Sequence, residues 1–202
     1  MVNDEVLNEF FKIARESIER LDRAVQVGMR SAHRAHGLYS DCPHGAASVV
    51  EAGLVLAVFT ALMEQQYPER HRVEVRHEYP YSQPSGPRMD LALLEPGPNG
   101  APTLGACIET KWWIAVKRES GDVAKMRVLC PKADVRKLML LAWGLPGDSK
   151  TLAEWVEPQA REIGLILRPS WCDSFPAAVY RGAREFLQEG RLWLALMEMV
   201  AT

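Results

Sequence analysis

The sequence has little that would direct it to a membrane or to an oxidising compartment. Its longest apolar stretch, residues 52–63, is too short to cross a bilayer and is interrupted by Gly53 and Thr60. The N-terminal segment is charged and amphipathic, without the apolar region of a secretory signal. The four cysteines are scattered and form no C-x-x-C motif, so free thiols are expected rather than disulfides. We therefore expect a soluble, cytoplasmic protein with no membrane partner.

An excess of basic charge and several common enzyme motifs are also missing. The formal net charge is −2 and the sequence pI is about 6.2. Non-specific coating of nucleic acid needs an excess of Lys and Arg and is therefore not indicated, although an enzyme can gather its basic residues on one face. Without a G-x-S-x-G, P-loop or G-x-G-x-x-G motif, esterase, NTPase and dinucleotide-binding activities are unsupported.

The apolar periodicity predicts one α/β domain across residues 1–202, with a small mixed β-sheet flanked by helices. The expected helices cover 3–30, 48–66, 132–143, 151–160 and most of 175–200. The expected strands cover 72–80, 89–94, 104–116 and 163–167. The segment 117–129 is expected to be a charged loop. The chain thus divides into an N-terminal helix and connector (1–46), a core (48–167) and a C-terminal helical segment (175–202).

Four charged residues occupy positions that the surrounding apolar pattern would turn inward. Glu109 and Lys111 share one face of the most apolar predicted strand, because side chains alternate along a strand. Asp90 begins the apolar stretch of the preceding strand. Glu51 lies in line with the apolar stripe of its helix. Burying such charges costs several kcal/mol unless they are paired or bind a metal, so these residues form a candidate site.

The order of these residues resembles the PD-(D/E)XK nuclease superfamily, whose members have a restriction-endonuclease-like fold. That pattern is a Glu on a helix, an Asp on a strand and Glu-x-Lys on the next strand, here Glu51, Asp90 and Glu109 with Lys111. Met89 stands at the leading proline position of the motif, a position that varies in the family. The resemblance points to no particular subfamily.

The resemblance covers roughly residues 48–167, and the predicted helix 132–143 falls where that fold places its crossover helix. It implies a nuclease that hydrolyses phosphodiester bonds, with DNA as the substrate on the strength of the resemblance alone. Because the chain is short for a self-sufficient sequence-specific endonuclease, we also expect a homodimer or a targeting partner protein.

The resemblance also implies a magnesium site, with manganese as the alternative ion. Asp90 and Glu109 would be metal ligands, and Glu51 would be a ligand or an outer carboxylate. Magnesium takes carboxylate oxygens, polarises the scissile phosphate and lowers the pKa of a bound water. Lys111 would hold the attacking water and stabilise developing charge. These four residues are the expected catalytic set.

Basic and aromatic residues near the candidate site are possible nucleic-acid contacts. The candidates for phosphate contacts are Lys132, Arg136 and Lys137 on the predicted helix 132–143, with Lys117, Arg118, Lys125 and Arg127 before it. A solvated helix face is at least as good an explanation. Trp112 and its neighbour Trp113 point to opposite faces of a strand, so at most one can stack on a base, and core packing is the alternative.

Each member of the site also has a simpler interpretation. Glu109 and Lys111 can form a structural ion pair, Glu51 can complete a capping box, and Asp90 can close a turn. The pattern [DE]-x-K is common by chance, and a second copy at residues 148–150 lies in a Gly/Pro-rich loop rather than a strand.

The main functional alternative is a catalytically inactive nuclease-fold protein that acts as a binding or scaffold module. The complete four-residue set favours an enzyme, whereas the acidic pI favours the binding module. Four residues could be considered as zinc ligands: His33, His36, Cys42 and His44. Their spacing fits none of the usual structural zinc patterns, so a zinc site is not indicated. A small-molecule phosphoesterase and a toxin–immunity partner have no direct support.

Overall fold

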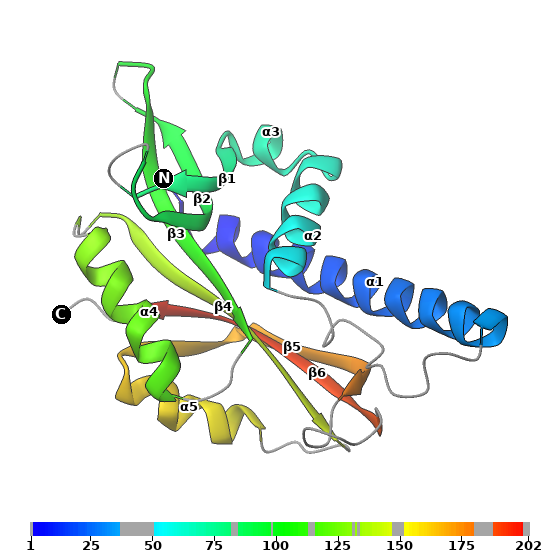
Figure 1. Cartoon of the computed structure of the whole chain (residues 1–202). Coiled ribbons are helices and arrows are strands. Elements are labelled where there is room, and N and C mark those ends of the chain that lie inside the picture. The colour runs from blue at the N-terminus through cyan, green and yellow to red at the C-terminus, as the bar shows by residue number, and fades with distance from the viewer. Residues whose placement is uncertain are drawn as a thin grey trace.

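A six-stranded mixed β-sheet with helices on both faces forms the described part of the chain (Figure 1). The computed structural model describes residues 2–36, 51–81, 85–97, 99–112, 116–130, 132, 134–146, 152–179 and 188–199. The helices are α1 (Asp4–His36), α2 (Glu51–Glu64), α3 (Tyr67–His71), α4 (Val116–Leu129) and α5 (Leu152–Glu162). The strands are β1 (Glu74–Pro80), β2 (Arg88–Pro96), β3 (Pro102–Trp112), β4 (Arg136–Pro146), β5 (Leu165–Val179) and β6 (Gln188–Met199).

The sheet has the order β1-β2-β3-β4-β6-β5. The first three strands form an antiparallel meander and match the strands expected at 72–80, 89–94 and 104–116. β4 then pairs with β3 in parallel, which requires a crossover, and α4 supplies it. β6 is antiparallel to both β4 and β5. The expected α/β class, a mixed sheet flanked by helices, is therefore confirmed.

The helix predicted at 132–143 is wrong, because this segment forms β4. Its apolar run is buried on both faces of the sheet. Leu138 and Leu140 pack into one apolar cluster, and Met139 and Leu141 pack into the other. A run that is apolar on both faces has no period of two, so periodicity cannot separate a central strand from a buried helix. The crossover helix is α4, in the segment 117–129 that the sequence had suggested was a loop.

The C-terminal helical segment predicted for 175–202 is also wrong in its described part. β5 extends the short strand expected at 163–167 as far as Val179, and β6 follows as the strand between β4 and β5. Leu, Met, Ala and Glu favour helices, but burial against cross-strand neighbours outweighs these weak intrinsic preferences.

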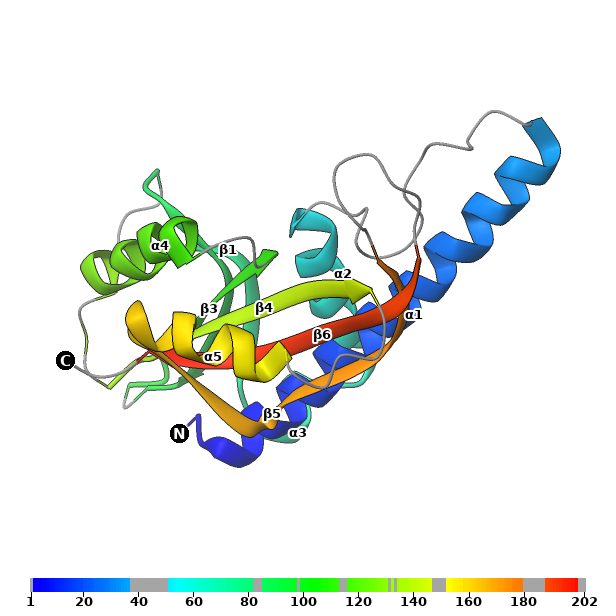
Figure 2. The same cartoon turned by 90° about the horizontal axis from the view of Figure 1, so that it is seen from below.

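Each face of the sheet has its own apolar cluster and its own pair of helices (Figure 2). α1 and α2 cover one face, where Phe10 and Leu54 are completely buried. α4 and α5 cover the other face, where Met126 and Val156 are completely buried. No helix in the described part of the chain is long and apolar enough to cross a membrane.

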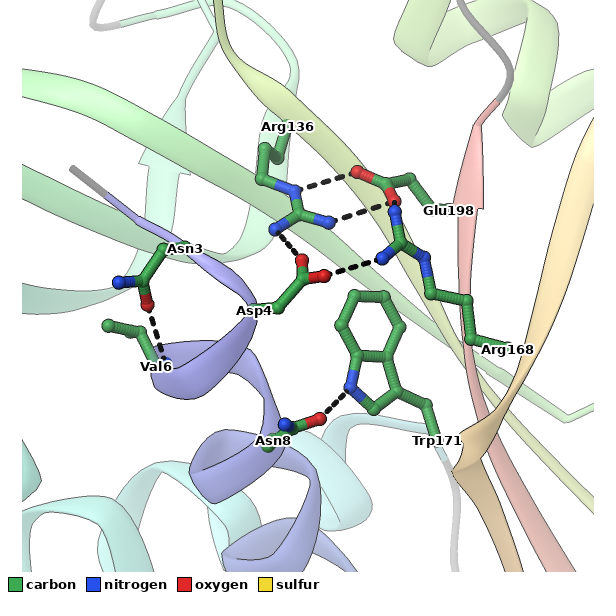
Figure 3. A network of polar contacts seen from close by, with 8 residues as sticks. All are labelled: Asn3, Asp4, Val6, Asn8, Arg136, Arg168, Trp171 and Glu198. Atoms are coloured by element: carbon green, nitrogen blue, oxygen red, sulfur yellow. Dashed lines mark hydrogen bonds and ion pairs between the residues drawn. The ribbon is translucent and has the colours of Figure 1, made fainter.

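A network of charged side chains ties the start of α1 to three strands (Figure 3). Arg136 on β4 donates two hydrogen bonds to Glu198 on β6, at 2.7 and 2.8 Å, and a third to Asp4 at 2.7 Å. Arg168 on β5 bridges the same two carboxylates, at 2.7 Å to Asp4 and 2.6 Å to Glu198. Both guanidinium groups lie over the buried Trp171 ring, 5.4 and 4.7 Å from its centroid. The hydrogen bond from Arg136 holds the pKa of Asp4 below its ordinary value.

Replacing Glu198 with Ala should lower the free energy of unfolding by about 1–3 kcal/mol, because Arg136 would lose two charge-assisted hydrogen bonds while only 17% exposed. Glu157→Ala is the control, because Glu157 pairs with Arg161 within one helix, with Arg161 68% exposed. This control should cost about 0.5 kcal/mol or less. Urea unfolding measures both values, and equal small losses would show that the network contributes nothing beyond a surface pair.

Candidate functional site

The four residues singled out by the sequence lie together near the carboxyl end of β3. Glu51 is the first residue of α2, and Asp90 lies on β2. Glu109 and Lys111 lie on β3. Leu91 pairs with Ile108, so the next positions of the two antiparallel strands bring Asp90 beside Glu109. The sheet register therefore assembles residues that are far apart in the sequence.

Glu109 is the most buried carboxylate of the site, with its side chain only 3% exposed. Its Oε1 atom accepts a hydrogen bond from the hydroxyl of Tyr81 and another from Nζ of Lys125 at 3.4 Å. Burial and the nearby charge of Glu109 raise the pKa of Tyr81, so its hydroxyl stays protonated and remains a donor. Asp90 has a different partner, because its Oδ2 accepts from the backbone N–H of Thr110 at 2.7 Å.

Burial raises the pKa of both Asp90 and Glu109 above the ordinary values. The charge of Asp90 raises the pKa of Glu109 further, while hydrogen bonds from Tyr81 and Lys125 oppose this effect. The hydrogen bond from the backbone N–H of Thr110 and the positive charge of Lys111 act against burial and lower the pKa of Asp90. The net result is two neighbouring carboxyl groups whose ionised forms are poorly solvated, the setting in which a cation binds most favourably.

Lys111 is a stable cation in this setting. Its Nζ lies 3.0 Å from Oε2 of Glu51 and 3.8 Å from Oδ2 of Asp122 on α4. Burial alone would lower the pKa of Lys111, but the hydrogen bond to Glu51 and the charge of Asp122 outweigh it and raise the pKa. Lys111 can therefore orient a water molecule or stabilise an anion, but it is not poised to accept a proton.

The chemistry of Asp90 and Glu109 fits a magnesium ion. Magnesium is commonly held by one or two carboxylates and keeps several of its waters. Glu51 is paired with Lys111 instead, so its position fits an outer carboxylate better than a third ligand. No three His, Cys, Asp or Glu residues in the described ranges are grouped as a ready set of metal ligands.

Three further residues complete the site, and of these only Lys125 was singled out from the sequence, as a candidate phosphate contact. Tyr81 follows directly after β1, and Asp122 and Lys125 lie one turn apart on α4. The spacing of Val123 and Met126, both buried, was an available sign of a helix in this segment. No local pattern, however, marked Tyr81 as a partner of Glu109.

The basic residues predicted to contact phosphate do not share a helix face, because their segment is not helical. Arg136 is engaged with Asp4 and Glu198 (Figure 3). Lys137 donates to the backbone carbonyls of Lys132, at 2.8 Å, and Val135, at 3.4 Å. The helix expected to carry these residues is therefore wrong, while their contact with phosphate stays a prediction.

The remaining predicted contacts are only partly described. Trp112 packs against the apolar cluster under α1 and α2, in agreement with the packing alternative. Trp113, Cys42, His44, the second [DE]-x-K copy at 148–150 and the side chains of His33 and His36 lie outside the described residues.

No protein-family model, curated protein or solved structure matches this chain. The class of protein therefore has to be inferred from the chemistry of the site and from the elements that hold it. The site offers a half-buried carboxyl group (Asp90) beside a buried one (Glu109), with a lysine two residues along β3.

Replacing Asp90 with Asn should stabilise the protein at neutral pH. The pKa of Asp90 is raised in the folded state, so the stability linked to its neutral form is complete below the unfolded pKa and is lost as pH rises through the folded pKa. Asn keeps an acceptor for Thr110 N–H and can donate to Glu109. We expect a gain of about 1 kcal/mol at pH 7.5, or roughly 2–4 °C in Tm, which shrinks towards pH 4.

Thermal unfolding from pH 4 to pH 8 measures this difference. Asp173→Asn is the matched control, because Asp173 is 54% exposed and forms an ion pair with Arg15 at 3.0 Å. It should bring no gain at pH 7.5. A loss of stability in the Asp90 variant at every pH would contradict the idea that the ionised site is destabilising.

Proposed function

We propose that the chain is a metal-dependent nuclease that hydrolyses phosphodiester bonds, with DNA as its substrate. The observation that carries the proposal is the half-buried carboxyl group of Asp90 beside the buried one of Glu109, with the ammonium group of Lys111 two residues along β3. Enzymes concentrate groups with perturbed pKa values at sites of chemistry, and an isolated structural role gives no reason to bury two like charges side by side.

The arrangement of elements supports the same class. The site lies between a three-strand antiparallel meander and a strand that joins it in parallel through a helix. The resemblance to PD-(D/E)XK nucleases requires a crossover helix after the Glu-x-Lys strand, and α4 occupies that place. α2, which carries Glu51, precedes the meander, as the resemblance also requires.

Asp90 and Glu109 would hold the ion, which supplies polarisation of the phosphate and a more acidic bound water when present. Lys111 donates hydrogen bonds from a charged ammonium group, so it orients the attacking water or a phosphate oxygen. Glu51 and Asp122 fix the position of this ammonium group. Tyr81 and Thr110 N–H fix the two carboxyl groups, which limits the reorganisation needed for reaction.

Target recognition would come from a second copy of the chain or from a separate partner protein. The net charge of −2 provides little general attraction for DNA, and Arg136 is already engaged in the network with Glu198. Light scattering of the active protein tests this expectation. A monomer with full, sequence-selective activity would contradict it.

The second candidate function is a non-catalytic binding module that keeps the nuclease fold. One observation favours it. The charges of the site are neutralised internally, with Lys111 paired to Glu51 and Lys125 paired to Glu109. Such pairs can serve stability alone, and fold does not fix function.

Metal titration combined with cleavage assays separates the two candidates. Isothermal calorimetry with Mg²⁺ and Mn²⁺ should show binding to the wild type and about tenfold or more weaker binding to Asp90→Asn and Glu109→Gln. Lys111→Met should keep metal affinity but lower the cleavage rate about 10²–10³-fold, because the cation that stabilises the transition state is missing.

Plasmid, linear and single-stranded DNA, together with RNA, serve as substrates in these assays. Glu74→Gln is the control, since Glu74 is an exposed carboxylate paired with Arg76 on β1. It should leave metal binding and cleavage unchanged. If millimolar metal does not bind the wild type even with nucleic acid present, the binding module takes the place of the nuclease.

A separate variant decides the role of Glu51. If Glu51 holds Lys111 rather than the ion, Glu51→Gln should keep metal affinity within about threefold and lower the cleavage rate about tenfold or more, as for residues that orient a reacting group. Calorimetry and rate measurements on the same sample provide both values. A loss of metal affinity as large as that of Asp90→Asn would instead make Glu51 a direct ligand.

A further inference from the structure

Lys125 on α4 is a second cation in the site, and the four-residue pattern does not include it. Its Nζ lies 3.4 Å from Oε1 of Glu109 and 5.6 Å from the centre of the Tyr81 ring. The side chain is 37% exposed, whereas that of Glu109 is 3% exposed. Lys125 therefore reaches a buried carboxylate from the solvent side and is held there by a charge and by an aromatic face.

The two lysines of the site differ in how firmly they are held. Lys111 has Glu51 at 3.0 Å and Asp122 at 3.8 Å, so it keeps its carboxylate partners when a metal binds elsewhere. The carboxylate that pairs with Lys125 is Glu109, a proposed metal ligand. A divalent cation on Glu109 would compete for the same oxygen and repel the ammonium group. Metal binding and the Lys125–Glu109 pair are therefore antagonistic.

We propose that Lys125 is a phosphate-contact residue that Glu109 restrains until a divalent cation displaces it. Once displaced, Lys125 lies on the solvent side of the site, one helical turn from Asp122, and binds a non-bridging oxygen of the nucleic-acid backbone. This inference rests on the proposed nuclease function and adds a coupling to it. Metal binding strengthens nucleic-acid binding by releasing the ammonium group of Lys125 as well as by adding the positive charge of the metal ion.

The first experiment measures DNA affinity by fluorescence anisotropy, with EDTA or with Ca²⁺, a hard cation that takes the same oxygen ligands. In EDTA, Lys125→Gln should bind DNA within about twofold of the wild type, because Lys125 is already neutralised. In Ca²⁺ it should bind about five- to tenfold more weakly. The slope of log K against log salt should fall by about 1, as expected for one lost phosphate contact, and only in Ca²⁺. Lys125→Arg should retain the metal-dependent behaviour.

The second experiment needs no metal. Glu109→Gln removes the restraint, so in EDTA it should bind DNA more tightly than the wild type, and the gain should vanish in the Glu109→Gln/Lys125→Gln double variant. Asp90→Asn is the matched control, because it removes the same charge from the site without touching Lys125. Any increase in DNA affinity that Asp90→Asn brings should persist in the Asp90→Asn/Lys125→Gln double variant.

The outcomes separate this inference from the proposed function. If the wild type binds metal and cleaves DNA but the salt slope of Lys125→Gln is unchanged in Ca²⁺, the role of Lys125 is overturned and the nuclease stands. Equal losses of affinity with and without metal would also overturn it. The gain in DNA affinity of Glu109→Gln in EDTA can depend on Lys125 while Mg²⁺ neither binds nor supports cleavage. In that case the restraint by Glu109 stands and the proposed nuclease function fails.

Discussion

The burial of β3 on both faces is the constraint on which the rest of the structure depends. Ala106 and Ile108 pack into the apolar cluster under α1 and α2, and Cys107 packs into the cluster under α4 and α5. The same strand then continues into Glu109 and Lys111, so charged groups begin where both clusters end. Their desolvation has to be offset locally, and every polar contact of the site serves that requirement.

Helices on both faces of the sheet supply the opposite charges that offset this desolvation. α2 comes from one face and places Glu51 on Lys111, while α4 comes from the other and places Lys125 on Glu109. Each charge on β3 is thus matched by an opposite charge from a different helix. The site consequently depends on both halves of the core, and Tyr81 packs against the apolar cluster under α4 and α5.

The predictable part of the molecule is the part that alternates, that turn residues bound or whose charges break an apolar pattern. β1 followed from its alternation, β2 and β3 followed from the Pro/Gly-rich turns that bound them, and Asp90, Glu109 and Lys111 stood out because charge interrupted apolar strands. β4 and β6 could not be recognised, because strands buried on both faces have no alternation to detect. The contact of Lys125 with Glu109 depends on the path of α4 across the sheet, and the contact of Tyr81 depends on where the chain leaves β1, and no local segment encodes either.

The strand order β4-β6-β5 makes the sheet depend on β6, which is synthesised after β5. During translation, β5 emerges before β6 yet can join the sheet only through it, since its pairing partner in the sheet is β6. Until β6 arrives, β4 presents a long apolar edge with unpaired backbone groups, a surface that invites pairing with other chains. The nascent protein therefore passes through a stage at which it depends on rapid completion, or on a chaperone, to remain unaggregated.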